Sequence, residues 1–416
     1  MHAAGAHWAP AGRVRPALEV ADIVRRFGDE LLSSHALGFE QRRALEHIAL
    51  CRTARLGGHV DVCPECGLQR PAYNSCRDRH CPKCQWLLSE RWLDSRLERM
   101  LPVHHFHVVF TLPSELRLLT MYNRRALFQL LFESGTTALK MLGADDRRLG
   151  AELGITAVLH TWSRDLGFHP HIHCVVTGGG LAPDGSWVRT RPGFLFPVRV
   201  LGKLFRGIFL GRLKRLADRG ELCFVGKCSP LASRGEWLRF MDKLYRKRWN
   251  VYSKKPFGGI EGVHRYLAKY THRIAISNRR LIHFDDRAVV FHTRHTRTAS
   301  LPPLAFLARF FSHVLPRNFV RIRHFGLYAS ANVNGRLQHA RALLEHKSAS
   351  RRPPDTTVNP ETDLHDEPDW VTRYRNATGI DLRCCPNCGA SLHRFTLVPE
   401  PAPPAIVLSR APPEAA

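Results

Sequence analysis

Three histidines alternate with other residues in one short stretch of the chain. Residues 168–176 read FHPHIHCVV, which places His169, His171 and His173 at every second position before an apolar run. Alternate side chains of a β-strand point to the same side, so this spacing predicts a strand with the imidazoles on one face. The opposite face would carry Ile172, Cys174 and Val176 into a core.

Strand geometry favours one pair of these histidines as metal ligands. Residues two apart on a straight strand are separated by roughly 6.6 Å, so two imidazoles can converge on one ion, whereas three in a row span too far. His171 and His173 flank the apolar Ile172, which can anchor the strand, but His169 and His171 flank Pro170, which suits the start or edge of a strand. We therefore expect His171 and His173 to bind a divalent ion. The alternative is that they are surface or hydrogen-bonded histidines without a metal.

Two other places offer histidines for the same chemistry. His105 and His107 flank Phe106 in the apolar run HHFHVVFTLP and form a rival pair. Residues 154–162 (GITAVLHTW) and 171–180 flank the loop SRDLGFHP and predict a hairpin. His160 lies on the first strand of that hairpin, where it could face the same site.

The charge of the chain indicates a polyanionic partner. The 416 residues carry 62 Lys and Arg against 36 Asp and Glu, a formal net charge of +26 that is spread along most of the chain. Phosphate binding with counterion release suits such a field, so nucleic acid is the expected partner. No apolar run approaches the roughly 20 residues of a membrane-spanning helix, and the N-terminal residues lack the apolar core of a signal peptide. We therefore expect a soluble, cytoplasmic, DNA-binding protein that does not contact membranes.

A tyrosine pair lies in a basic segment. Tyr266 and Tyr270 are four apart in a run that predicts a helix after Gly258 and Gly259, so both phenols would lie on one helix face. Pairs with this spacing usually pack in a core, but basic residues crowd this segment. We expect five of them to contact DNA: Arg265, Lys269, Arg273, Arg279 and Arg280.

These residues together could cut and rejoin DNA. A phenolate that attacks a phosphodiester needs the phosphate charge neutralised and the leaving 3′ oxygen stabilised, and a divalent ion held by two imidazoles does both. Two histidines with open coordination positions favour Mn²⁺ and also allow Mg²⁺. A tyrosyl phosphate would preserve bond energy for strand joining, and the sequence contains no G-x-x-x-x-G-K-[ST] nucleotide loop.

The cysteines predict structural zinc. Of the twelve, six lie between Cys51 and Cys84 and three between Cys384 and Cys388, clusters that indicate metal rather than disulfides. Two Cys-Pro-x-Cys knuckles in the first cluster predict one closed, tetrahedral Zn²⁺ site formed by Cys63, Cys66, Cys81 and Cys84. A second, interleaved zinc site could use the remaining candidates, Cys51, His59, Cys76 and His80. The alternative is that Cys51 is simply buried and that His80 faces solvent.

The element pattern predicts an α+β fold in three parts. Residues 1–100 would hold two helices and a zinc-ribbon-like domain, whose arginines and lysine would contact DNA or form a solvated face. Residues 101–347 would form an antiparallel sheet flanked by helices, because strands and helices do not alternate regularly. Residues 348–416 would be a proline-rich linker and tail with the half zinc site Cys385-Pro-Asn-Cys388.

Several motifs resemble those of a known family. LGGHVDVCPECG, YNSCRDRHCPKCQ, FTLP, LHTW through HPHIHCVV, YLAKYTHRIAISNRRL and VRIRHFGLYA occur in the order found in the insertion-sequence 91 family of rolling-circle transposases, which are HUH endonucleases. The resemblance implies an HUH endonuclease domain after an N-terminal zinc-binding domain. It also implies that His171 and His173 bind the catalytic metal and that Tyr266 and Tyr270 are nucleophiles.

The substrate that the resemblance implies is single-stranded DNA at the ends of the element and at its target, cut to a 5′-phosphotyrosine and a free 3′-OH. HUH sites often use a third ligand, for which His160 and His169 are the candidates here. Two other functions fit the same residues: a rolling-circle replication initiator or relaxase with the same chemistry, and a zinc-ribbon DNA-binding protein without enzymatic activity.

Overall fold

The protein is described here from a computed structural model. The structure describes residues 17–84, 99–254, 275–294, 297–349, 375 and 381–397. Within these ranges no helix combines the length and the apolar character needed to cross a bilayer.

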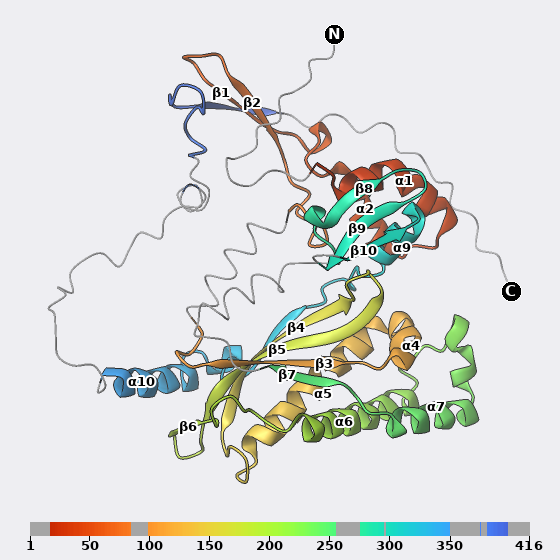
Figure 1. Cartoon of the computed structure of the whole chain (residues 1–416), viewed down its shortest axis with the longest axis vertical. Helices are drawn as coiled ribbons and strands as arrows, with labels where there is room; N and C mark the ends of the chain where they lie inside the picture. Colours follow the sequence, from red (N-terminus) through yellow and green to blue (C-terminus); the bar gives the residue numbers. More distant parts are fainter. Residues whose placement is uncertain are drawn as a thin grey trace.

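A six-stranded antiparallel sheet forms the centre of the fold (Figure 1). Its main path runs β11-β4-β5-β3-β7, and β6 pairs with β5. The strands are β3 (His105–Thr111), β4 (Glu152–Trp162), β5 (Phe168–Leu181), β6 (Trp187–Arg189), β7 (Val251–Lys254) and β11 (Ile322–Gly326). β4 and β5 form the predicted hairpin, and the central antiparallel sheet of the expected α+β fold is confirmed.

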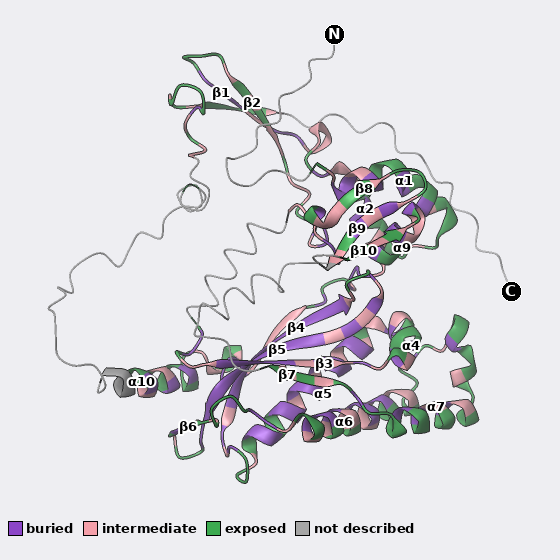
Figure 2. Ribbon diagram, in the orientation of Figure 1, coloured by how far each residue is buried: buried purple, intermediate pink, exposed green. Residues whose placement is uncertain are grey.

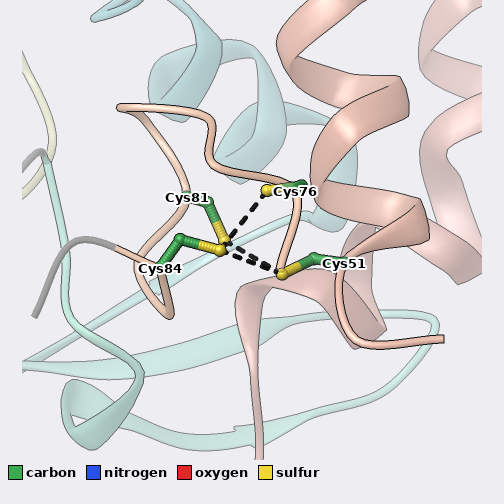
Figure 3. Close-up of side chains that lie close together, drawn as sticks. All are labelled: Cys51, Cys76, Cys81 and Cys84. Atoms are coloured by element: carbon green, nitrogen blue, oxygen red, sulfur yellow. Dashed lines mark hydrogen bonds between the residues drawn. The ribbon is translucent and has the colours of Figure 1, made fainter. Parts of the chain in front are cut away.

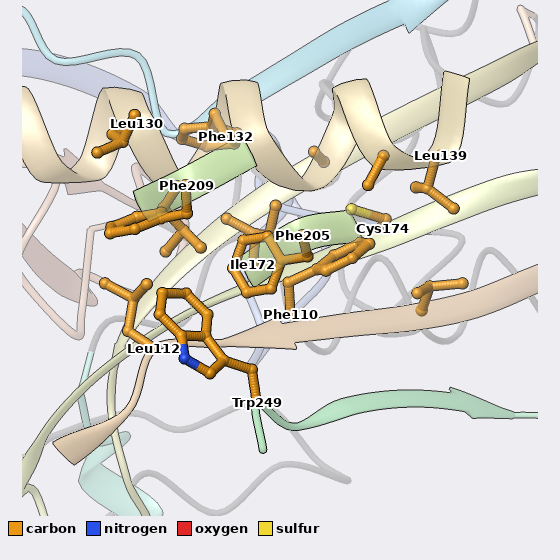
Figure 4. Packing of buried hydrophobic residues seen from close by; sticks show 14 of the residues in the cluster. Phe110, Leu112, Leu130, Phe132, Leu139, Ile172, Cys174, Phe205, Phe209 and Trp249 are labelled. Atoms are coloured by element: carbon orange, nitrogen blue, oxygen red, sulfur yellow. The ribbon is translucent and has the colours of Figure 1, made fainter. Parts of the chain in front are cut away.

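Helices cover one face of this sheet (Figure 1). They are α4 (Arg117–Tyr122), α5 (Arg124–Ala144), α6 (Val198–Asp218) and α7 (Arg234–Arg246). Ile172, Cys174 and Val176 belong to the core beneath them, as the alternation predicts, and each is fully buried. Figure 4 shows Ile172 and Cys174 in this packing. At Gly135 of α5 a Cβ would lie 2.8 Å from Ile172 Cδ1, so glycine permits this close approach of helix and sheet.

β4 and β5 are buried along most of both faces (Figure 2). On the face opposite the helices, His173 is accordingly buried, whereas His169 and His171 are half-buried. This matters because the alternating histidines lie on that face.

A second core joins the two expected N-terminal helices to a later part of the chain. α1 (Val20–Ser34) and α2 (Phe39–Leu50) pack against a three-stranded sheet and a helix from the region around residue 300. These later elements are β8 (Leu281–Phe284), β9 (Val289–Arg294), β10 (Arg297–Leu301) and α9 (Pro303–Phe311). The backbone N–H of Val20 donates to Asn278 Oδ1 at 3.1 Å and ties the start of α1 to this unit.

A small ribbon sheet combines both ends of the chain. Its order is β12-β1-β2, built from β1 (Gly58–Val62), β2 (Gln69–Tyr73) and β12 (His393–Leu397). The packing thus crosses both predicted domain boundaries, because residues near 300 complete the N-terminal helical core and residues near 395 complete the N-terminal sheet.

The remaining elements connect these units. α10 (Arg336–Ala349) packs through Leu337, Ala340 and Leu344 on Leu101 and Trp187. Short 3-10 helices are η1 (Ala54–Leu56), η2 (Ser114–Leu116), η3 (Gly226–Ala232), η4 (Asn278–Arg280) and η5 (Ser330–Asn332).

Candidate metal centres and tyrosine site

The β4–β5 hairpin brings three histidines together. His160 pairs directly with His171 across the two strands, and His173 follows two residues later on the same face. The ligand atoms of these three side chains all lie within 4.8 Å of one another. Two ligands on one strand and a third on its neighbour converge, whereas His169 is not part of the group.

The tautomer of His171 is fixed by a backbone bond. Its Nδ1–H donates to the carbonyl oxygen of His169 at 2.7 Å, which leaves the lone pair of the neutral ring on Nε2. Burial lowers the pKa of His171 to about 4, so the ring is neutral at pH 7. A neutral imidazole oriented by a carbonyl is the usual form of a metal ligand. His169 contributes to this arrangement through its backbone.

His107 on β3 contacts the trio from the other side. Its Nε2 lies 2.9 Å from Nδ1 of His173, and the two rings stack with centroids 5.1 Å apart. Burial holds the pKa of His107 at about 4 and that of His173 well below its usual range. Because both rings are neutral, one nitrogen of this pair donates and the other accepts.

The two histidines of the rival pair, His105 and His107, have different partners. His105 does not face the trio: its Nε2 lies 2.7 Å from the hydroxyl of Tyr328. His107 lies beside the trio but outside the group of three ligand atoms. The aromatic wall next to the site is Trp162, which stacks on His160 at a centroid distance of 4.5 Å.

The cysteines form two groups of four that differ from the expected one. Cys81 and Cys84 lie with Cys51 and Cys76, whereas Cys63 and Cys66 lie with Cys385 and Cys388. The prediction of a single site from Cys63, Cys66, Cys81 and Cys84 is therefore wrong in its pairing. Strand β2 lies between the two knuckles in the sequence. The knuckle of Cys63 and Cys66 therefore lies at the ribbon sheet, whereas that of Cys81 and Cys84 packs on the helical core.

The first group joins the helical core (Figure 3). Cys51 ends α2, and its Sγ lies 3.2 Å from that of Cys84 and 3.7 Å from that of Cys81. The Sγ atoms of Cys76 and Cys84 are 3.5 Å apart. A tetrahedral ion with Zn–S bonds of about 2.3 Å separates its sulfur ligands by about 3.8 Å, so this donor set fits zinc. Four thiolates close the coordination shell, which suits a structural rather than a catalytic site.

The second group joins the ribbon. Cys63 lies 3.4 Å from Cys388, and Cys66 lies 3.5 Å from Cys385, measured between Sγ atoms. Cys63 and Cys385 are buried, whereas Cys66 and Cys388 are exposed.

Neither extra histidine belongs to these groups. His80 is buried rather than facing solvent, because its Nδ1 lies 3.1 Å from Asp78 and its Nε2 accepts from Leu315 N–H. His59 lies 3.9 Å from Asp61, and burial lowers its pKa.

Much of the basic face expected around the cysteines is bonded within the protein. Arg70 pairs with Asp61 at 2.9 Å, and Lys83 pairs with Glu19 at 2.5 Å. Arg79 donates to the carbonyls of Pro316 and Phe319 at 2.9 and 2.8 Å. These three cations have partners within the protein, and the expectation that the remaining basic residues of this region contact DNA or form a solvated face stays a prediction.

The tyrosines and most of the expected DNA contacts lie outside the described residues. These are Tyr266, Tyr270, Arg265, Lys269 and Arg273. Arg279 is described and exposed. Arg280 donates to the carbonyls of His292 and Arg164 and lies over the Phe291 ring, so it also braces the β8–β9 hairpin.

Comparisons with known proteins place the chain in a family. The family described as "Putative transposase" matches residues 154–335, and the one described as "Transposase zinc-binding domain" matches residues 23–112. The chain is 43% identical over 378 residues to "Putative transposase y4qJ" of Sinorhizobium fredii, covering 89% of this chain and 92% of that protein. The chain belongs to the insertion-sequence 91 type of transposases. It is also 29% identical over 296 residues to the "Transposase for insertion sequence element IS801" of Pseudomonas savastanoi pv. phaseolicola, covering 67% of this chain and 68% of that protein. No solved structure matches the transposase.

The two matched ranges divide the candidate sites of the transposase. Residues 23–112 include the four cysteines of the first group, and residues 154–335 include the three histidines and both tyrosines. Cys385 and Cys388 lie outside both ranges. A motif that the two paired knuckles share in the sequence could nevertheless have indicated their pairing. Cys63-Pro-Glu-Cys66-Gly67 and Cys385-Pro-Asn-Cys388-Gly389 both end in glycine, whereas Cys81-Pro-Lys-Cys84 is followed by Gln85.

Proposed function

We propose that this transposase nicks and rejoins single-stranded DNA at the ends of its element and at the target, through a transient 5′-phosphotyrosine. The observation that carries the proposal is the convergence of His160, His171 and His173 on one face of the β4–β5 hairpin. A transposase needs both a way to break a phosphodiester and a way to keep its energy for joining. The histidine group supports the first requirement, and a covalent tyrosyl phosphate would meet the second.

The residues present fit a divalent metal at the histidine group. Three ligand atoms within 4.8 Å match the donors that one ion gathers, and neutral imidazoles leave lone pairs for it. His160, His171 and His173 would hold Mn²⁺ or Mg²⁺, with His169 contributing its carbonyl to orient His171. Bound there, the ion would neutralise phosphate charge and stabilise the leaving 3′ oxygen.

His107 completes the arrangement as a positioning residue. For His173 to ligate through Nε2, its Nδ1 must carry the proton and donate it to Nε2 of His107. In the opposite tautomer His107 donates, and both nitrogens of His173 are then engaged by protons. In the ligating arrangement, His107 accepts through Nε2, so its own proton is on Nδ1. The 2.9 Å bond then holds the His173 ring in its ligating orientation.

The nucleophile in this proposal is the phenol of Tyr266 or Tyr270. Its oxygen forms a bond to phosphorus while the bond from phosphorus to the 3′ oxygen breaks, and the phenolic proton ends on that 3′ oxygen. Attack of a 3′-OH on the tyrosyl phosphate reverses these steps, so joining requires no nucleotide hydrolysis. Two tyrosines would allow one strand to be held while another is cut.

The charge of the chain supports DNA as the substrate. The net charge is +26, and Arg265, Lys269, Arg273 and Arg279 lie around the tyrosines in the sequence. Phosphate neutralisation by such residues would supply most of the affinity for a single strand.

A covalent-adduct assay tests this function. Purified protein is incubated with labelled single-stranded oligonucleotides that carry the element's ends, with Mg²⁺ or Mn²⁺, and the products are separated under denaturing conditions. We expect a protein–DNA adduct for the native chain and none for the Tyr266→Phe/Tyr270→Phe double variant. An adduct that persists in the double variant removes the tyrosines as nucleophiles, and a native chain that binds the oligonucleotide but gives no adduct supports the non-enzymatic binder instead.

A control separates loss of chemistry from loss of folding. The His171→Ala/His173→Ala variant should bind the same oligonucleotide with unchanged salt dependence but form no adduct. If it nicks as fast as the native chain, the histidine group is not the catalytic metal site.

A further inference from the structure

The second cysteine group brings together residues from opposite ends of the chain. Cys63 and Cys388 are 325 positions apart, and Cys66 and Cys385 are 319 apart. Neither sequence match includes both halves, because the zinc-binding match ends at residue 112.

Two loops of the same geometry present these cysteines. In the first, Gly67 N–H donates to the carbonyl of Cys63 at 3.0 Å, and in the second Gly389 N–H donates to the carbonyl of Cys385 at 2.9 Å. Both glycines have positive φ, +70° and +77°. Glycine adopts this conformation without steric cost, and the turn points both sulfurs of a knuckle to one side.

A second bond repeats in both loops. Cys63 N–H donates to the carbonyl of Leu68 at 2.8 Å, and Cys385 N–H donates to the carbonyl of Ala390 at 2.7 Å. Each knuckle is thus a closed turn whose shape does not depend on the other. Two such preformed turns facing each other are what a four-thiolate zinc ribbon requires.

The sulfur distances favour a shared ion over disulfides. The Sγ–Sγ separations of 3.4 and 3.5 Å are far above the about 2.05 Å of a disulfide. They are close to the about 3.8 Å between thiolates on a tetrahedral zinc. All four sulfurs lie within 4.8 Å of one another, as one ion requires.

The surrounding contacts hold the same two segments together. β12 pairs antiparallel with β1 from Gly58–Leu397 to Val62–His393. The buried Asp61 accepts from Arg394 at 2.7 Å and from Arg70 at 2.9 Å, and Arg70 also donates to the carbonyl of Leu382. The C-terminal segment therefore completes the N-terminal ribbon through strand pairing, an ion pair and the cysteines.

We propose that Cys63, Cys66, Cys385 and Cys388 form a second zinc site, which fastens the C-terminal segment 381–397 to the N-terminal ribbon. The zinc-binding unit of this transposase is then assembled from both ends of the chain. Because Cys66 and Cys388 are exposed whereas Cys51 and Cys81 are buried, this ion is the more accessible of the two to a chelator. Its release removes one of the attachments of β12, beside the strand pairing and the ion pair, and leaves the first cysteine group in the helical core intact.

Zinc counting on full-length variants tests the proposal. Native mass spectrometry with excess Mg²⁺ should give two zinc ions per native chain and one for Cys385→Ser/Cys388→Ser. Cys384→Ser is the matched control, because Cys384 adjoins Cys385 but does not belong to the group, and it should retain both ions. A Cys385→Ser/Cys388→Ser chain with the native zinc count overturns the proposal.

Cysteine alkylation of the native protein provides a test that does not depend on any variant. Peptide mapping should show Cys63, Cys66, Cys385 and Cys388 protected from iodoacetamide while the exposed Cys223 reacts. A chelator titration should expose these four together, with release of one zinc, before the first group reacts. Alkylation of Cys385 and Cys388 at the rate of Cys223 in the zinc-loaded native chain overturns the proposal, and so does a Cys63–Cys388 disulfide peptide under non-reducing conditions.

Discussion

Replacing His107 with Phe tests whether a hydrogen bond from β3 tunes the proposed catalytic metal. The side chain is only 6% exposed, so a ring of similar size can occupy its space. What disappears is the 2.9 Å bond between His107 Nε2 and His173 Nδ1. Loss of a bond that orients a metal-binding histidine typically costs 10–100-fold in metal affinity, or about 1.4–2.7 kcal/mol. We expect the Mn²⁺ concentration for half-maximal nicking to rise by about that factor.

The assay is a titration of nicking rate against Mn²⁺ at saturating oligonucleotide. A positioning role predicts that the rate at saturating Mn²⁺ approaches the native value, since the ligands remain. His105→Phe is the matched control, because His105 lies on the same strand and face but bonds Tyr328 instead. Its midpoint should stay native even if its melting temperature falls. The reasoning is refuted if His107→Phe and the native protein need the same Mn²⁺ concentration for half-maximal nicking. It is also refuted if His107→Phe and His105→Phe raise that concentration equally.

Three further predictions concern the core, the pH dependence and the DNA. Ile172→Ala should lower the free energy of unfolding by about 2–5 kcal/mol, measured by urea denaturation, because Ile172 is fully buried against α5; a change below 1 kcal/mol contradicts the packing. Burial lowers the pKa of His313 to about 3. Between pH 6.5 and about 3 this histidine is therefore protonated in the unfolded chain but neutral in the folded one. The free energy of unfolding should accordingly fall as the pH drops through that window. The ring of His313 faces Thr161 Oγ1 and the Leu166 carbonyl, and Arg124 and His80 lie nearby. His313→Gln should reduce the slope of the free energy of unfolding against pH by up to about 1.4 kcal/mol per pH unit. An unchanged slope counts against a neutral His313. Affinity for single-stranded DNA should decrease with a log–log salt slope of about −0.7 per phosphate contacted, and a flat response in a filter-binding titration contradicts phosphate contacts.

The sheet could be predicted because its signals are local. Alternation in residues 168–176 placed Ile172 in the core, and the loop after Trp162 predicted the hairpin, since both depend on neighbours in the sequence. The packing of residues near 300 on α1 and α2 could not be predicted in this way. It depends on contacts such as Val20 N–H to Asn278, which join residues 258 positions apart and leave no periodic trace.

Which cysteine knuckles share a metal site also depends on contacts between distant residues, although the sequence holds one indication of it. Proximity in the sequence suggested that Cys63 and Cys66 pair with Cys81 and Cys84, but spatial pairing follows the turns that present the sulfurs. Gly67 and Gly389 mark two matching turns, whereas the sequence of the middle knuckle continues with Gln85 instead of glycine. The role of His107 was inaccessible for a different reason, since only the register of β3 against β5 brings it beside His173.

Arg79 links the first cysteine group to the edge of the central sheet. It lies between Cys76 and Cys81, and its guanidinium donates to the carbonyls of Leu315, Pro316 and Phe319, just before β11 pairs with β4. Lysine keeps the charge but cannot span three acceptors with a planar fork. Arg79→Lys should therefore lower the free energy of unfolding by about 1–3 kcal/mol without changing the salt slope of DNA binding.

The exposed Arg77 provides the matched control for this substitution. Within the described part of the chain the Arg77 side chain donates to no such group of carbonyls, so Arg77→Lys should leave stability within about 0.5 kcal/mol of the native value. A phosphate contact by Arg79 would give the opposite result: Arg79→Lys would keep native stability, and Arg79→Ala would reduce the salt slope of DNA binding by about one contact. Because stability and salt slope are measured independently, the two roles cannot be confused. A bracing role would mean that the first cysteine group helps to fix the position of β11 and, through the pairing of β11 with β4, that of His160.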